Sequence, residues 1–216
     1  EMCIRDSARV GIDVKAFTFY VGGLPKIRKK PFEYKAPFSP VDVIEEYTRP
    51  ARFRVNGGNV TREALSDPEL IHFEKVGTLE AFNTDGLRSI LKSFPHIPNM
   101  VEKTLRYPGH IDLIRNLRDA GFFSTEEVKV KGQKVRPIDL TSSLLIKEWK
   151  LGESEEEFTI MRVIVEGEYN GENIEVTFDL YDEYDKESSM ARTTGYTCTG
   201  VLKTLMDGSF THKGVY

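Results

Sequence analysis

Motifs typical of metal and nucleotide sites are missing from this chain. Its two cysteines, Cys3 and Cys198, lie too far apart to match a zinc-ligand spacing, and its four histidines are scattered. The sequence contains no Gly-x-Gly-x-x-Gly fingerprint, no P-loop and no Gly-x-Ser-x-Gly elbow. We therefore predict no metal-binding and no cofactor-binding residues here, and we exclude hydrolases that use a nucleophile elbow.

Strong charge of one sign and long apolar runs are also absent. The formal net charge is −4, so the chain has no basic field that would attract nucleic acid. No apolar run approaches the length of a membrane span, and no signal peptide is recognisable. The few cysteines suit a reducing compartment. These features predict a cytoplasmic protein that binds neither nucleic acid nor membrane.

What the chain does contain is ample material for a core. Hydrophobic residues make up 39% of its 216 residues, with 13 Phe and 9 Tyr, which suits one domain. The two ends are less regular. Residues 1–7 resemble a translated sequencing adapter and are excluded from fold reasoning. At the other end, the chain stops at residues 212–216 without a further helix or a polar tail that would close the domain. We predict a domain over residues 8–216 that is truncated at both ends.

Hydrophobic periodicity predicts both strands and helices. Strands are expected at residues 15–21, 31–38, 52–55, from 60 onward, 70–74, 78–82, 100–107, 158–167 and 173–180, and residues 126–131 are expected to form a brief strand or an extended loop. Helices are expected at residues 40–47, 84–94, 108–120, 137–149 and 188–206. Adjacent Gly22 and Gly23 should let another backbone approach closely. Gly195 and Gly200 lower the propensity of the last helix, which predicts close packing against a neighbour, and Cys198 is expected to be buried.

The segment 104–110 concentrates functional side chains at the end of a strand and the start of a helix. Arg106, Tyr107 and His110 place a cation, a phenol and an imidazole beside a helix N-terminus, which suits an anionic ligand. The alternative is that Arg106 pairs with a nearby acid and His110 only occupies the first helical turn. His110 is in register with Ile114 and Leu117, so it should lean toward the core.

Three expected helices each follow a strand, at Ser39–Pro40, at Thr84–Asp85 and at residues 108–110. If the strands share one sheet, the three N-termini can open at one edge and bind a ligand with more than one carboxylate. Lys35, Tyr107 and Asp85 would supply groups for proton transfer near an amine or imine. The alternative is three capped helices that point at water.

Five segments in order resemble the saccharopine dehydrogenase-like family. They are the strand ending in Gly-Gly-Leu-Pro (residues 17–25), the aromatic segment 32–40, residues 80–87, residues 104–110 and the helix at 190–200. The resemblance covers essentially the whole chain after residue 8. It implies an α+β domain with a mixed, largely antiparallel β-sheet and helices packed on one face. This would be the second domain of a two-domain dehydrogenase, with the Rossmann domain expected before residue 8.

The family resemblance also implies a function. The intact protein would be an oxidoreductase of lysine metabolism that acts on a CH–NH bond with NAD or NADP, bound mainly by its own Rossmann domain. Residues 8–216 would supply substrate binding and contacts within a homodimer, and would be inactive alone. We assign substrate binding to Arg106, Ser39, Pro40, Thr84 and Asp85. We assign catalysis to Tyr107, His110 and Lys35.

Two other interpretations stay open. A lysine 6-dehydrogenase-like relative would share the architecture but need one carboxylate site where saccharopine needs three. A non-catalytic binding or dimerisation module could have kept the same fold. A Gly-x-Gly-x-x-Gly unit upstream in the complete gene would distinguish an enzyme from such a module.

Overall fold

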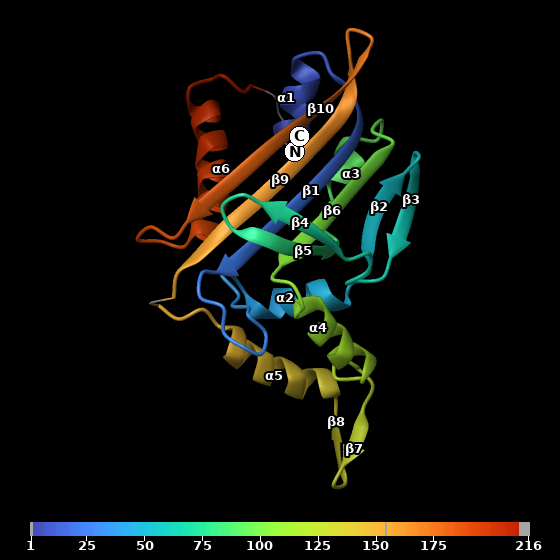
Figure 1. Ribbon diagram of the computed structural model, residues 1–216, viewed down its shortest axis with the longest axis vertical. Helices are drawn as coiled ribbons and strands as arrows, with labels where there is room; N and C mark the ends of the chain where they lie inside the picture. Colours follow the sequence, from blue (N-terminus) through green and yellow to red (C-terminus); the bar gives the residue numbers. More distant parts are fainter. Residues whose placement is uncertain (1, 154, 212–216) are drawn as a thin grey trace.

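The computed structural model describes residues 2–153 and 155–211, which form six helices and ten strands (Figure 1). The helices are α1 (Met2–Arg9), α2 (Pro40–Thr48), α3 (Ile90–Ser93), α4 (His110–Asp119), α5 (Pro137–Trp149) and α6 (Ser189–Met206). The strands are β1 (Asp13–Pro25), β2 (Ala51–Val55), β3 (Gly58–Arg62), β4 (Glu69–Phe73), β5 (Gly77–Asn83), β6 (Asn99–Arg106), β7 (Val128–Val130), β8 (Gln133–Val135), β9 (Glu157–Tyr169) and β10 (Glu172–Glu183).

One eight-stranded sheet organises the chain. Its main path runs β10-β9-β1-β6-β2-β3, and β5 pairs with both β6 and β4. Only the pairing of β1 with β6 is parallel; the other pairings are antiparallel. The expected α+β class with a mixed, largely antiparallel sheet is confirmed. β7 and β8 form a separate hairpin that projects from the end of the molecule at the bottom of Figure 1.

The two faces of the sheet are covered differently. The β4–β5 hairpin crosses in front of β1 and β9 in Figure 1, on the face that carries Tyr20 and Ile160. On the opposite face Ile4 of α1 packs against Phe17 and Val165. The start of α6 also lies on this second face, since Met190 approaches Gly23. α2, α4 and α5 gather at the lower end of the sheet (Figure 1).

Two sequence predictions of local structure are wrong. Residues 31–38 form no strand; Ala36 makes an isolated bridge to Lys150 and the rest is loop. The helix expected from Thr84 is also absent, because the Thr84 hydroxyl donates to Glu102 on β6 and caps nothing. Only the single turn of α3 forms in this region, at Ile90–Ser93. Burial of the loop after β5 therefore overrides its helical pattern.

The last helix forms as predicted, and its predicted close packing against a neighbour stays a prediction, because no described residue covers its glycines. A methyl group added at Gly195 or Gly200 would meet nothing within 4 Å among the described atoms. Cys198 is exposed rather than buried. Exposed apolar residues on α6 include Tyr196, Val201, Leu202, Leu205 and Met206.

The beginning of the chain is part of the packed structure. Ile4 on α1 is only 1% exposed and belongs to the core cluster around Phe17. Residues 1–7, left outside the predicted domain, therefore include a residue of the packed core, and the predicted adapter origin of the segment stays a prediction. Residues 212–216 lie outside the described residues. None of the described helices is long and apolar enough to cross a membrane.

The glycine pair supplies the first testable prediction. A Cβ at Gly22 would lie 2.9 Å from the Leu105 Cβ and 3.0 Å from the Leu105 carbonyl oxygen. Gly22→Ala should therefore lower the free energy of unfolding by about 1–3 kcal/mol, since the neighbouring strand cannot move away freely. Gly195→Ala is the matched control in open space and should raise it by roughly 0.5–1 kcal/mol. Urea unfolding measures both. Equal effects would contradict close approach at Gly22.

Candidate functional site

Two adjoining hollows lie over β1 and β6, on the face of the sheet that carries α1 and α6. They share Val21, Glu46 and Thr104, and we call them together the groove. The first hollow, about 320 Å³, is mainly apolar and is also lined by Gly22, Gly23, Phe38, Arg106, Met190 and Thr194. The second, about 290 Å³, is polar and is also lined by Phe19, Arg49, Thr84, Asp85, Gly86, Arg88 and Glu102.

Strand register places these side chains together. Parallel pairing sets Phe19 opposite Glu102 and Val21 opposite Thr104. Since alternate residues of a strand point to the same face, Glu102, Thr104 and Arg106 follow one another along β6 on the groove side. The groove therefore has an apolar wall from β1 and a polar wall from β6.

Arg106 is 2% exposed and has several partners inside the protein. Its Nε donates to the Tyr47 hydroxyl at 3.0 Å, and its Nη2 donates to Glu46 Oε2 at 3.2 Å. Nη1 donates to the Leu105 carbonyl at 2.9 Å. The guanidinium also stacks 4.4 Å from the centre of the Tyr34 ring. The alternative to ligand binding was that Arg106 pairs with a nearby acid, and Glu46 is such an acid. Arg106 nevertheless borders the groove.

A directed chain of hydrogen bonds continues from Arg106 into the core. The Nδ1 of His110 lies 2.9 Å from the Phe32 carbonyl, which can only accept, so Nδ1 carries the proton. The Nε2 of His110 must then accept from the Tyr47 hydroxyl, also at 2.9 Å. Burial and the nearby Arg106 charge lower the pKa of His110 to about 3. His110 is therefore neutral at physiological pH and orients Tyr47. Its predicted lean toward the core is confirmed.

Glu102 is a second buried ionisable group, 2% exposed in the polar hollow. Its Oε2 accepts from the Thr84 hydroxyl at 2.6 Å and from the Gly86 N–H at 3.0 Å. Burial raises the pKa of Glu102 to about 7, and these two hydrogen bonds only partly oppose that rise. No cation forms an ion pair with Glu102 among the residues the structure describes. The carboxyl group therefore changes charge near neutral pH.

Asp85 shows the opposite behaviour in the same hollow. It accepts a two-point contact from Arg52, with Nε at 2.9 Å and Nη2 at 2.8 Å. This pairing keeps the pKa of Asp85 below its usual range. Arg49 adds a longer contact, 3.7 Å from Nε to Oδ2. Asp85 is therefore an ionised carboxylate whose charge is already balanced.

The other predicted site residues do not meet at the groove. The Tyr107 hydroxyl donates to the Pro25 carbonyl at 2.9 Å, and Lys35 donates to the Glu148 carbonyl at 2.5 Å. Ser39 makes no side-chain cap, and Pro40 is only the first residue of α2. The three helix N-termini do not form one rim, because α3 does not begin at Thr84. Only Arg106, Thr84 and Asp85 line the groove.

Sequence reasoning missed Glu46, Glu102 and Thr104. The pattern of β6 contained a signal for two of them, since polar Glu102, Thr104 and Arg106 alternate with Val101, Lys103 and Leu105. Three polar residues on one face of a central strand indicate a polar site when that strand is buried. Glu46 had no such signal, because only the packing of α2 brings it to Arg106.

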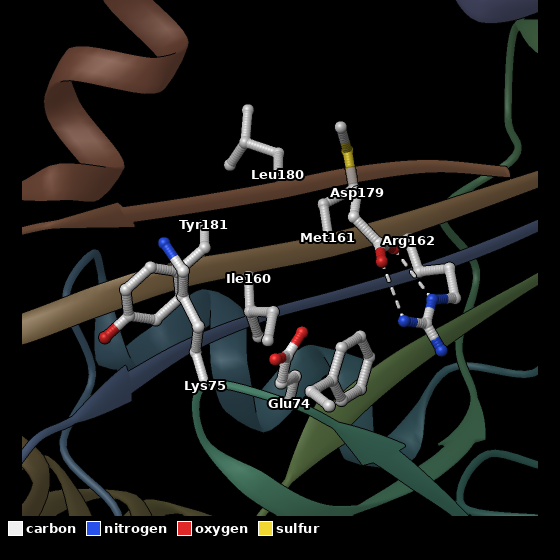
Figure 2. Close-up of a pocket in the computed structure, with 9 residues that line it drawn as sticks. Glu74, Lys75, Ile160, Met161, Arg162, Asp179, Leu180 and Tyr181 are labelled. Carbon is white, nitrogen blue, oxygen red and sulfur yellow. Dashed lines mark hydrogen bonds and ion pairs between the residues drawn. The ribbon is translucent and has the colours of Figure 1, made fainter.

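A further hollow of about 420 Å³ lies on the opposite face, between the β4–β5 turn and β9–β10 (Figure 2). Arg162 and Asp179 form a two-point ion pair there, with both distances 2.7 Å. Lys75 sits 4.8 Å from the centre of the Tyr181 ring. None of the predicted site residues lines this hollow, and two of its four charged residues, Arg162 and Asp179, pair with each other. Within residues 2–153 and 155–211, no group of His, Cys, Asp and Glu could hold a metal ion.

Comparison with known proteins decides the family. The model of the saccharopine dehydrogenase C-terminal domain matches residues 2–216. The chain belongs to this family. A solved structure with the same fold is apo, histidine-tagged saccharopine dehydrogenase (L-Glu forming) from Saccharomyces cerevisiae, at a TM-score of 0.75 and 19% identity. The match covers 99% of this chain and 63% of the yeast chain.

In this saccharopine dehydrogenase C-terminal domain, the pair of Arg106 and Glu46 can be tested by substitution. Arg106→Met should lower the free energy of unfolding by about 3 kcal/mol, because it leaves the Glu46 carboxylate and the Tyr47 hydroxyl without their donor. This loss lies at the lower end of the range expected when a buried ion pair is broken, because the Glu46 side chain is 27% exposed.

The double variant Arg106→Met with Glu46→Leu supplies the control. It removes the stranded carboxylate and should unfold at a higher urea concentration than Arg106→Met alone. A double variant less stable than the single one would argue against the pairing.

The raised pKa of Glu102 predicts that the stability of the domain depends on pH. An acid whose folded-state pKa is raised holds a proton that the unfolded chain releases, so stability falls as pH rises from the unfolded pKa to the folded one. Between pH 4.5 and about pH 7 the loss should reach about 3 kcal/mol and then level off. Glu102→Gln should lack this loss. The difference in unfolding free energy between the two proteins, measured across this window, is the test, and a difference constant with pH would contradict it.

Proposed function

We propose that this chain is the substrate-binding and dimerisation domain of a cytoplasmic NAD(P)-dependent oxidoreductase of the saccharopine dehydrogenase type. The intact enzyme would act on a CH–NH bond of an amino-acid substrate in lysine metabolism. The observation that carries the proposal is the groove, where three acids and three arginines line two adjoining hollows within a domain of this family. Charges of both signs suit a ligand that carries both carboxylates and a nitrogen cation.

The adjacent glycines of the described chain do not fit a dinucleotide. The Gly22–Gly23 pair lies within β1 rather than at a helix N-terminus, and its free space is already taken. Leu105 fills the side of Gly22, and Met190 and Pro37 fill that of Gly23. We therefore assign NAD or NADP to a separate Rossmann domain of the intact protein and derive no step through it from these residues.

The role proposed for this chain is to bind and orient the substrate. Arg106 and Thr84 would face the substrate from β6 and the loop after β5, held by Glu46 and Glu102 respectively. Tyr47 and neutral His110 would act as positioning residues, because they fix the guanidinium of Arg106 through the hydrogen-bond chain. Asp85 would shape the polar end of the groove while paired with Arg52.

The dimerisation part rests on α6. Its exposed apolar side chains, including Leu202, Leu205 and Met206, would be covered by a second subunit or by the Rossmann domain.

One observation favours a second candidate, a non-catalytic binding or dimerisation module. Tyr107, His110 and Lys35, the residues predicted to be catalytic, are each hydrogen-bonded within the protein and do not line the groove. Chemistry in the intact protein would then depend on residues outside this chain.

Turnover of the full-length protein tests these proposals. Saccharopine with NAD or NADP should give nicotinamide reduction, followed by absorbance, whereas the 216-residue chain alone should give none. Reduction with L-lysine but not with saccharopine would instead support the lysine 6-dehydrogenase-like alternative. If neither substrate gives reduction of NAD or NADP, the proposal of an enzyme would be overturned, and the non-catalytic module would be the remaining candidate.

A further inference from the structure

Glu102 differs from the other carboxylates of the groove in lacking a cation. Asp85 is paired with Arg52 at 2.8 Å, and Glu46 is paired with Arg106 at 3.2 Å. Among the side chains that the structure describes, no Lys, Arg or His forms an ion pair with Glu102. A buried carboxyl must either keep a proton or gain a cationic partner, because an isolated buried charge is strongly disfavoured.

The geometry leaves one oxygen of Glu102 available. Both hydrogen bonds from the described residues, donated by Thr84 and Gly86, end on Oε2. Oε1 accepts none of these bonds and is not among the buried atoms without a partner, so it is open to the hollow. The absence of a side chain at Gly86 leaves room for this carboxyl group, since a Cβ there would lie 2.5 Å from Glu102 Cδ.

The charges that face Glu102 come from two segments. α2 and the residue after it contribute Glu46 and Arg49, and the loop after β5 contributes Asp85 and Arg88. Arg49 contacts Glu45 and Asp85, and Arg88 donates to the Asp85 carbonyl. β1 contributes only Phe19 and Val21, and β6 adds Thr104. Neither arginine forms an ion pair with Glu102, although the buried Nε of Arg49 has no hydrogen-bond partner among the described residues. The nearby acids Glu46 and Asp85 disfavour a further negative charge on Glu102.

We propose that Glu102 is a ligand-binding residue whose carboxyl group binds the amine nitrogen of the substrate at the polar end of the groove. This assignment rests on the proposed function for the identity of the ligand as an amino acid. When a neutral amine binds, the carboxyl proton moves from Glu102 to the nitrogen and leaves a carboxylate–ammonium pair. When an ammonium ion binds, the same proton leaves to solvent. No electron changes hands in either case.

Carboxyl ¹³C NMR of the 216-residue chain labelled at glutamate can follow this exchange, with the Glu102 signal assigned by its loss in Glu102→Gln. Without ligand the midpoint should lie near pH 7. Excess n-butylammonium should lower it by about one pH unit, which corresponds to roughly tenfold tighter binding to the ionised carboxyl. Butyrate, which has a similar chain and the opposite charge, should not lower it.

Glu74→Gln is the matched control, since Glu74 lines the hollow on the opposite face. It should leave the Glu102 response unchanged. A midpoint that n-butylammonium does not move, or that butyrate lowers equally, would overturn the proposal.

The outcome is independent of turnover in the full-length protein. A Glu102 signal that responds to the ammonium ion in a protein without dehydrogenase activity would refute the enzyme and keep the amine site. An active enzyme with an unresponsive Glu102 would refute only the amine site.

Discussion

The parallel pairing of β1 with β6 is the constraint on which the rest of the structure depends. It sets Phe19 and Val21 beside Glu102 and Thr104, so that an apolar and a polar row share one face. The strands are close enough at Gly22 that the Cβ and the carbonyl group of Leu105 fill the space of a side chain. Because β1 also pairs with β9 along nearly its whole length, its position between two strands is strongly determined. The groove inherits its geometry from this register.

Burial of polar groups at the end of β6 is made possible by directed hydrogen bonding. Arg106 donates to Tyr47, Tyr47 donates to His110, and His110 donates to the Phe32 carbonyl. Every member has a partner of the opposite kind, which is the condition under which a buried polar network does not destabilise the core. A protonated His110 would interrupt this chain of hydrogen bonds, because both ring nitrogens would then be donors and Nε2 could no longer accept from Tyr47. The neutral imidazole is thus a structural requirement of the arrangement.

Two carboxyl groups that line the same hollow, those of Asp85 and Glu102, show how the surroundings of an acid decide its pKa. Asp85 has a guanidinium in two-point contact and is ionised, whereas Glu102 has only a hydroxyl and an amide and keeps a proton up to about neutral pH. Such a divergence of pKa within one cavity is typical of ligand-binding and catalytic sites. The polar end of the groove therefore contains a carboxylate of fixed charge, Asp85, and a carboxyl group whose charge can respond to a ligand, Glu102.

The resemblance to the family predicted the fold class. Periodicity along the chain predicted most strands and four of the helices, because alternation and 3.6-residue spacing depend only on which faces are apolar. It also determined that His110 leans inward, from its register with Ile114 and Leu117. It did not determine that Thr84 bonds to Glu102, since a capping residue and a buried hydroxyl look alike until a partner strand is placed. The tertiary structure was needed to show that Arg106 pairs with Glu46, and that Glu102 has no ion-pair partner among the described side chains. It was also needed to show that Tyr107 and Lys35 make their hydrogen bonds away from the groove. Each of these depends on contacts between segments far apart in the chain, which local patterns do not encode.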